Sequence, residues 1–475
     1  MTTRHENHPN SAVSLSRVVV VNPKLLQPQR VLQLSNLDRQ CPTLMYLVFF
    51  YNPSQAFKDL SLNSVFNDLK SGLEETLTLW YPAAGRLTLN QSDGKLNLWC
   101  NNQGAILVEA HTSLKISQLG DLSQYNNVFE SLVYKPPFDG NFSSMPLVVA
   151  QVTKFGCGGY SIGIGTSHSL FDGPATYDFL SAWASSSAIF FKGKRVSELQ
   201  KPVHERGILL TEGNGQAPKG SNNLPTNSNL NQQQTIRATA IQHLYHLIMQ
   251  AASEQKDFPL QIGRLDQNNC VLKTYHLSGA MIDYLKRKLV PIRGSLPFST
   301  FEVLATHLWK ARTKALRLRK EKMVCLQFAV DTRNKTVPPL PRGFSGNAYV
   351  LASVMMTVKE LEEASQESVI EQVREAKNAV NHDYVKAYVD ALGGAGASLP
   401  PLRELTLVSD WTRMPFHNVD FFREKAAYTS PLASPIPQVA YFMQNPNHNS
   451  SVDVRIGLGA ETINAFSDYF LVRGQ

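Results

Sequence analysis

A polar segment, residues 213–234, divides the chain into two halves of similar size. Only Ala217, Leu224 and Leu230 in this segment are apolar. It therefore cannot bury enough apolar surface to offset the entropy that ordering it would cost. The sequence predicts four parts, which are a flexible N-terminus at 1–12, a domain at 13–205, a flexible crossover linker at 206–235 and a domain at 236–475.

Composition narrows the class of protein. Hydrophobic residues make up 43% of the chain and charged residues 18%, which is enough apolar material for two cores and excludes a wholly disordered chain. Lys and Arg number 46, against 38 Asp and Glu. This mild basic excess suits an anionic ligand, but it is diffuse and no nucleic-acid motif accompanies it. We expect no nucleic-acid partner.

The sequence also bears on location. No segment reaches the roughly 18 apolar residues that a membrane-spanning helix needs, so we expect no transmembrane segment. The N-terminus is polar and lacks the apolar stretch of a secretory signal. The five cysteines are scattered, without a C-x-x-C pair, as in proteins with reduced thiols. These features predict a cytoplasmic protein, and no metal site is indicated.

Strand and helix patterns occur in both halves. Residues 44–51 and 146–155 read as strands, and residues 64–79 carry apolar side chains at helical spacing. Ser299 and Glu302 have the spacing of a capping box at the start of another helix. The mixture predicts an α/β fold.

One strand-to-helix connection carries the clearest candidate chemistry. Residues 160–167 alternate with a period of two, which predicts a strand, and its glycines leave one face nearly bare for close approach of a backbone or a ligand. Gly173 and Pro174 then begin a helix. His168 and Asp172 are therefore expected in the connection between the two elements.

His168 is the candidate general base. An imidazole has an unperturbed pKa of about 6.5 and so accepts a proton readily near neutral pH. Asp172 could orient the ring, or it could hold the connection through an arginine. The pattern alone is weak, and taken by itself it favours a hydrogen-bonded structural histidine over a catalytic one. A metal site is a poorer reading, because no third ligand is evident.

Several motifs, taken together, resemble the plant BAHD family of acyl-CoA-dependent acyltransferases along nearly the whole chain. The histidine motif of that family is His-x-x-x-Asp-Gly, which His168, Asp172 and Gly173 match. Other matching segments, in the family's order, are residues 34–38, 81–87, 146–155, 299–312, 330–333 and 338–347.

The resemblance implies two similar chloramphenicol-acetyltransferase-like domains, with mixed sheets flanked by helices and an active-site channel at the domain interface. It implies acyl transfer from acyl-CoA to a hydroxyl or amine of a plant metabolite, lipid alcohol or hormone. His168 would be the base. Acyl-CoA would be a co-substrate, with no metal or other cofactor, and the family expectation is a monomer.

The resemblance also implies roles for further residues. Asp172 would point away from the substrate and pair with an arginine, for which Arg333 is the candidate. Ser409 and Trp411 match a Ser/Thr-x-Trp element near the reacting carbonyl, where a donor for the oxyanion is needed. The alternative reading makes Trp411 a core residue and Ser409 a turn residue.

The chain departs from the second signature of the family, Asp-Phe-Gly-Trp-Gly. Asp420, Phe421 and Lys425 remain of that motif, but Phe422 and Glu424 replace the two glycines. Because glycines in a loop usually meet a backbone demand, the loop must adopt another conformation. This puts normal CoA binding in doubt and supports a second hypothesis, a non-catalytic or weakly catalytic partner protein. A condensation-type domain is a more remote third hypothesis.

Two other features have both a structural and a functional reading. A basic run near the end of the helix after Ser299 suits the helix dipole, and the phosphates of CoA are the functional alternative. Its members are Lys314, Arg317, Arg319, Lys320 and Lys322. His307 lies within the same helix, and we predict a structural role for it.

Overall fold

The computed structural model describes residues 13–40, 43–55, 60–137, 141–187, 201–210, 270–289, 297–392, 404–422, 424–432, 439–448 and 450–471. The predicted N-terminus at 1–12 and residues 211–235 of the predicted linker lie outside these ranges.

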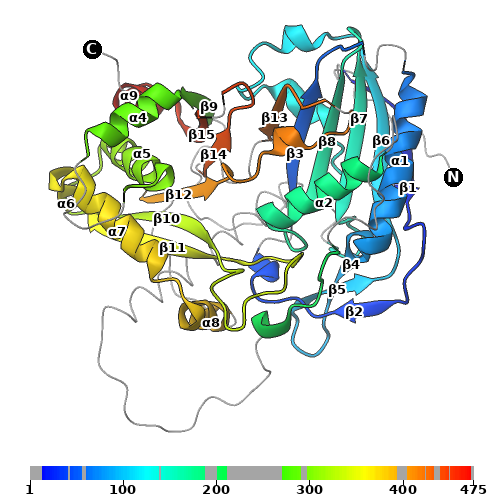
Figure 1. The fold of residues 1–475 in the computed structure, drawn as a ribbon, viewed down its shortest axis with the longest axis horizontal. Helices are drawn as coiled ribbons and strands as arrows, with labels where there is room; N and C mark the ends of the chain where they lie inside the picture. The colour runs from blue at the N-terminus through cyan, green and yellow to red at the C-terminus, as the bar shows by residue number, and fades with distance from the viewer. Residues whose placement is uncertain are drawn as a thin grey trace.

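Two six-stranded mixed sheets form the framework of the molecule (Figure 1). The first has the order β1 (Ser14–Val21), β6 (Ala105–Thr112), β7 (Val148–Phe155), β8 (Tyr160–Ser167), β3 (Leu44–Tyr51) and β13 (Tyr428–Pro431). The second has the order β11 (Tyr349–Thr357), β10 (Met323–Asp331), β12 (Leu405–Asp410), β14 (Ala440–Gln444), β15 (Val452–Gly459) and β9 (Cys270–Leu277). A small third sheet has the order β2 (Arg30–Leu32), β5 (Leu96–Cys100) and β4 (Arg86–Leu89).

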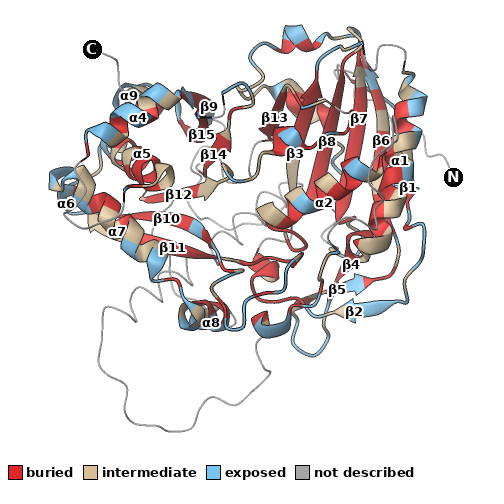
Figure 2. Cartoon of the chain, in the orientation of Figure 1, coloured by how far each residue is buried: buried red, intermediate tan, exposed pale blue. Residues whose placement is uncertain are grey.

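Helices cover the two large sheets separately. On the first sheet, α1 (Leu62–Leu79) and α2 (Gly173–Ser186) lie side by side (Figure 1). The second sheet is covered by α5 (Thr300–Leu316), which packs between α7 (Gln366–Asn378) and α9 (Ala460–Phe470). The remaining described helices are α4 (Gly279–Arg287), α6 (Val358–Glu363) and α8 (His382–Ala391). Figure 2 shows that the buried residues follow the strands and the helix faces turned toward them. This is the α/β fold with mixed sheets that the sequence predicts.

The halves of the sequence exchange segments across the two cores. Strand β13 comes from the second half but pairs with β3 of the first sheet, Tyr428 opposite Phe50. Phe421 and Phe422 likewise belong to the first core cluster, whereas Leu37 belongs to the second. The two predicted domains are therefore interleaved, and residues 428–431 do not join the sheet of their own half.

The predicted linker begins later than the sequence suggested. Arg206 is 4% exposed and Leu209 is 1% exposed, so the start of the segment is packed rather than flexible. Val203 forms a β-bridge with Phe344 just before it. Residues 206–210 thus depart from the predicted flexible linker, because Leu209 is buried in the fold and the charge of Arg206 pairs with Asp38.

The local predictions agree closely with the structure. Strand β3 has the predicted bounds, and α1 begins after Ser61, whose hydroxyl caps it. Ser299 and Glu302 form the predicted capping box of α5. The glycine face of β8 does admit a backbone, since a Cβ on Gly163 would lie 2.0 Å from the carbonyl oxygen of Leu132. Among the described residues, no helix is both long enough and apolar enough to cross a membrane.

Candidate active site

His168 lies directly after β8, at the end of the strand and before the start of α2. Its backbone N–H donates to the carbonyl oxygen of Thr43, 2.9 Å away, which continues the pairing of β8 with β3. The side chain is partly buried and lines a large cavity. The histidine is thus held by a strand end and faces open space.

The amide of Asn347 fixes the ring of His168. Asn347 Nδ2 donates to the carbonyl oxygen of His168 (2.7 Å) and to Asp38 Oδ1 (3.0 Å). Because the two acceptors claim the amide nitrogen, Asn347 Oδ1 must be the atom that faces His168 Nδ1, at 3.1 Å. Nδ1 therefore carries the hydrogen. The other ring nitrogen, Nε2, has an available lone pair, which is the tautomer a general base requires.

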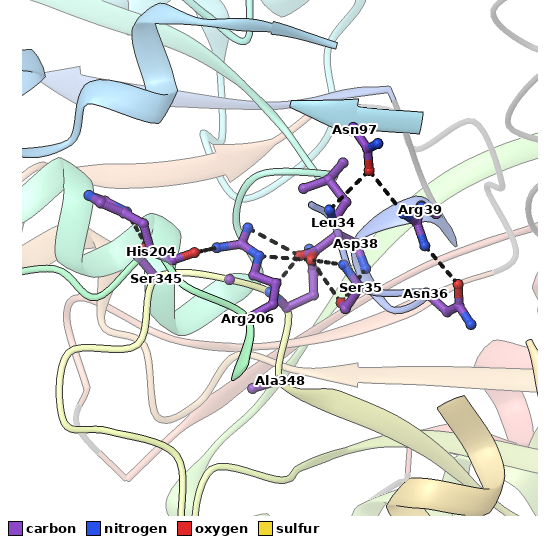
Figure 3. Close-up of polar contacts among 12 residues, drawn as sticks. Leu34, Ser35, Asn36, Asp38, Arg39, Asn97, His204, Arg206, Ser345 and Ala348 are labelled. Atoms are coloured by element: carbon purple, nitrogen blue, oxygen red, sulfur yellow. Dashed lines mark hydrogen bonds and ion pairs between the residues drawn. The ribbon is translucent and has the colours of Figure 1, made fainter. Parts of the chain in front are cut away.

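Asp38 is the buried anchor of this arrangement (Figure 3). Arg206 Nε donates to its Oδ2 at 2.9 Å, and the backbone N–H and hydroxyl of Ser35 donate to the same oxygen. The backbone N–H of Asn347 donates to Oδ1. Burial alone would raise the pKa of the Asp38 carboxyl, but Arg206 and Asn347 outweigh it and hold that pKa below its ordinary value. Asp38 is therefore an anion that orients Asn347.

His204 extends the same network toward α1. Its Nε2 lies 2.9 Å from the carbonyl oxygen of Leu79. Its Nδ1 lies 2.7 Å from Ser345 Oγ, and Arg206 Nη1 donates to the carbonyl oxygen of His204 (Figure 3). Burial lowers the pKa of His204 to about 4. This imidazole is neutral at physiological pH and has a structural position.

Asp172 and Arg333 form a bidentate ion pair. Arg333 Nη2 donates to Asp172 Oδ1 at 2.8 Å and Nη1 donates to Oδ2 at 2.9 Å. Asp172 also accepts from the backbone N–H of Ala175, as the N-cap of α2, and from that of Ala348. Every carboxylate oxygen is thereby used for structure. The pair expected from the sequence is present, and no hydrogen bond or ion pair joins the side chains of the described residues Asp172 and His168.

Ser409 and Trp411 approach the cavity from the second sheet. Ser409 lies in β12, and Trp411 follows the strand. The backbone N–H of Trp411 donates to the carbonyl oxygen of Phe442 on β14. The indole Nε1 donates to Ser409 Oγ at 3.0 Å. The serine hydroxyl then has its own hydrogen to donate elsewhere. Both side chains line the cavity, although Trp411 also packs against the first core.

The cavity has a volume of about 1360 Å³ and is bounded by both sheets. Its first wall comes from β3, the end of β8 and the start of α2, and its second from β10, β11, β12 and β14. The lining is rich in aromatic and aliphatic side chains, including Phe142, Phe171, Phe301, Phe328, Phe416 and Tyr441. This volume exceeds the roughly 300–1,000 Å³ of a typical ligand pocket, and it suits a bulky apolar molecule together with a second substrate.

The degenerate second motif lies outside the cavity lining. Asp420 and Lys425 are exposed, whereas Phe421 packs edge-on against Trp183 at 5.0 Å between ring centroids. Phe422 stacks on Tyr160 of β8. The loop is therefore closed onto the first core by Phe421, which the family motif shares, and by Phe422, which stands where the family has a glycine.

The basic run is largely engaged by neighbouring side chains. Lys320 pairs with Glu362, Lys322 pairs with Glu404, and Lys314 lies over the ring of Tyr469. No member of the run is among the described residues that line the cavity. The arrangement favours the structural reading over the CoA-phosphate reading.

The predicted structural position of His307 agrees with its surroundings. Its Nε2 lies 2.8 Å from the carbonyl oxygen of Phe470, on whose ring it stacks, and burial lowers its pKa.

Sequence reasoning missed the residues that orient His168. Asn347 and Asp38 both lie in segments that match the family, but no role was assigned to either. The signal available was the position of each residue at the end of a segment that matches the family, Asp38 after 34–37 and Asn347 after 338–346. Arg206 was placed in the linker, where a single charged residue gives no signal at all.

Comparison with known proteins supports the same class of protein. A model of the Transferase family matches residues 12–471. The chain is 52% identical over 454 residues to brassinosteroid-related acyltransferase 1 of Arabidopsis thaliana, covering 93% of this chain and 94% of the relative. It is 28% identical over 459 residues to omega-hydroxypalmitate O-feruloyl transferase of the same plant, covering 94% and 92%.

Solved structures share the fold. Vinorine synthase matches with a TM-score of 0.67 at 19% identity, covering 95% of this chain and 96% of that one. F. sporotrichioides TRI101, complexed with coenzyme A and T-2, matches with a TM-score of 0.66 at 13% identity, covering 94% and 98%.

The fold, the histidine segment beside a cavity bounded by two sheets, and these matches define an acyltransferase. The chain belongs to the BAHD family of plant acyl-CoA-dependent acyltransferases, the Transferase family whose model spans nearly its whole length.

Proposed function

We propose that the protein transfers an acyl group from acyl-CoA to a hydroxyl group of a bulky, apolar plant metabolite, with His168 as the general base. The observation that carries the proposal is the pairing of His168 Nδ1 with Asn347 Oδ1, which leaves Nε2 as the basic nitrogen of a residue that lines the cavity. Acyl-CoA is a co-substrate, and the proposed chemistry uses no cofactor besides it.

The proposed reaction proceeds in two steps. His168 Nε2 takes the proton of the acceptor hydroxyl as its oxygen attacks the carbonyl carbon of the thioester. The resulting oxyanion accepts a hydrogen bond from the hydroxyl of Ser409, which the indole of Trp411 holds from the other side. The carbon–sulfur bond then breaks, CoA leaves as a thiolate, and the imidazolium of His168 returns the proton to it.

The relatives suggest the class of acceptor. Two of them act, by their names, on a hydroxylated fatty acid and a fatty alcohol, and the relative at 52% identity is named for brassinosteroids. The apolar, aromatic lining of the cavity suits such molecules better than a highly charged acceptor. A steroid alcohol is therefore the first acceptor to test, followed by long-chain alcohols.

The first experiment measures donor binding and then transfer. Calorimetry with acetyl-, malonyl-, hydroxycinnamoyl- and long-chain acyl-CoA selects the donor, and product formation with steroid and fatty alcohols identifies the acceptor. His168→Ala should bind the donor as the wild type does but lose about 10²- to 10⁴-fold in turnover. His111→Ala, an exposed histidine bonded to Ser16, is the matched control and should keep full activity. An unchanged rate in His168→Ala would refute the assignment of the base.

A second candidate function is a non-catalytic or weakly catalytic partner protein. The second family motif is altered here, and this alteration favours the hypothesis. Phe422 and Glu424 stand where the family motif has two glycines, so the loop cannot keep the family's backbone conformation. Under this hypothesis a folded sample binds none of the four acyl-CoA classes. His168→Ala would then still support the cellular role, and affinity purification would recover a stable complex.

A further inference from the structure

The two segments proposed to act on the substrates come from different sheets. His168 and Gly173 flank the connection from β8 to α2, whereas Ser409 and Trp411 lie at the end of β12. The oxyanion donor and the base must keep a fixed separation across the cavity for the reaction to proceed. A direct contact between the segments would supply that constraint.

Met414 makes this contact. A Cβ added to Gly173 would lie 2.6 Å from Met414 Sδ and 2.8 Å from Met414 Cε, and apart from its chain neighbours and the backbone of α2 it would meet no other described atom within 4 Å. The space at Gly173 is therefore filled by one side chain from the opposite segment. An unbranched thioether is well suited to lie against a bare Cα, because it is flexible and polarizable.

The backbone of Met414 is hydrogen-bonded within the turn that carries Trp411. Its backbone N–H donates to the carbonyl oxygen of Trp411 at 2.9 Å, and its own carbonyl oxygen accepts from the N–H of Phe416 at 2.7 Å. Phe416 in turn packs on Tyr177 of α2. Because Gly173 and Tyr177 are four residues apart on one helix, the turn after β12 rests on one face of α2 at two points.

We propose that Met414 is a positioning residue that couples the His168 segment to the Ser409 and Trp411 segment through its contact with Gly173. A methyl group on Gly173 displaces the thioether end of Met414 and so breaks this contact between the two segments. Gly173, the glycine of the histidine motif, must therefore stay small because the side chain of Met414, from the turn after β12, fills the space beside it. This inference rests on the proposed acyl transfer.

The test is a double-mutant cycle on Gly173→Ala and Met414→Ala, read out by the turnover of acyl transfer. Gly173→Ala should lower turnover by about two- to tenfold, as expected for the loss of one pairwise contact, while the acyl-CoA Kd stays unchanged. Met414→Ala removes the obstruction, so the double variant should be more active than Gly173→Ala alone. Met414→Leu, which keeps the volume, should stay close to wild type.

Met145→Ala is the matched control, because Met145 lines the same cavity but is not near the Cβ position of Gly173. Its effect should multiply with that of Gly173→Ala. If the effects of Gly173→Ala and Met414→Ala also multiply, the coupling is refuted. If Gly173→Ala alone yields no folded protein, recovery of folded protein in the double variant becomes the measurement, and its absence refutes the contact.

A second readout separates this inference from the proposed function. The same cycle is measured by urea unfolding, which reports the contact between Met414 and Gly173 without any substrate. If the wild type transfers no acyl group, the proposed function fails. The unfolding cycle then still shows whether the two residues are coupled, and midpoint shifts that simply add would refute the contact.

Discussion

The amide of Asn347 contacts His168 at two points, with Oδ1 3.1 Å from the ring Nδ1 and Nδ2 2.7 Å from the carbonyl oxygen. Both contacts are set by Asp38, which accepts from the amide nitrogen and the backbone N–H of the same asparagine. The orientation of the proposed base is thus decided by an anion that does not touch it. Removing this support should affect the reaction without removing the base.

Asn347→Ala tests this relationship. The substitution leaves His168 free to rotate and to adopt the other tautomer, so turnover should fall about tenfold to a hundredfold, corresponding to the roughly 1–3 kcal/mol of a lost buried hydrogen bond. Steady-state kinetics and acyl-CoA calorimetry on the purified variant measure it. Asn378→Ala, on the opposite wall of the cavity, is the control. Equal turnover in Asn347→Ala and wild type would show that the ring needs no orienting partner.

Asp38→Asn tests the buried ion pair with Arg206. Removing the carboxylate leaves the guanidinium buried without a counter-charge, which should lower the free energy of unfolding by about 3–5 kcal/mol. Urea denaturation measures the loss, and Asp283→Asn on the exposed face of α4 should change stability by no more than about 0.5 kcal/mol. A loss as small as that of the control would contradict a stabilising role.

The carboxyl group of Asp38 should also make the stability of the protein depend on pH in the acid range. The folded pKa of Asp38 lies below its unfolded value, so its contribution to stability is complete above about pH 4 and is lost as the pH falls through the folded pKa. Because Asp38→Asn lacks this titration, its stability should decline less steeply than that of the wild type below pH 4. Parallel curves from chemical denaturation at each pH would refute the assignment.

His204 should make the stability of the protein depend on pH in a second, less acidic range. Burial lowers its pKa to about 4, so between about pH 6.5 and 4 the unfolded chain binds a proton that the folded protein does not. Stability should therefore fall with decreasing pH in this window, at about 1.4 kcal/mol per pH unit from this residue.

Other buried histidines contribute in the same window, so the wild-type slope alone is not diagnostic. His204→Gln removes one titration, and its stability curve should be flatter than that of the wild type by about 3 kcal/mol over the window. The amide of glutamine can still donate to the carbonyl oxygen of Leu79. Chemical denaturation at several pH values measures both curves, and equal slopes would show that His204 is not held neutral.

The local elements could be read from the sequence because their signals are local. A continuous apolar run sets β3, and a hydroxyl three residues before a carboxylate sets the start of α5. The His168 connection was also predictable, since glycine alternation and a following proline mark its two ends. Family motifs then supplied the pair of Asp172 with Arg333, which composition and periodicity could not.

Long-range pairings escaped the sequence analysis. Asn347 is 179 residues from His168, and its role depends on the loop between β10 and β11 reaching the end of β8. Strand β13 has only four residues, and its partner β3 lies in the other half of the chain. Neither the period of a segment nor its composition specifies which distant edge it will join, so the interleaving of the two cores was not expected.

Phe422→Gly addresses the altered second motif. The ring stacks on Tyr160 at 5.2 Å and lies 4.7 Å from the ring of Tyr51, and the residue is fully buried. Restoring the family's glycine should therefore lower the free energy of unfolding by at least about 3–5 kcal/mol, as for truncation of a core phenylalanine.

Glu424→Gly is the matched control, because it restores the other glycine at a partly exposed position bonded to Ser54. It should cost much less stability, as a surface substitution does. If the loop acts only by covering the first sheet, Phe422→Gly and Glu424→Gly should both bind acyl-CoA with wild-type affinity while their stabilities differ. Tighter acyl-CoA binding in Glu424→Gly would instead show that the loop has lost a contact with the donor, and it would favour the partner-protein hypothesis.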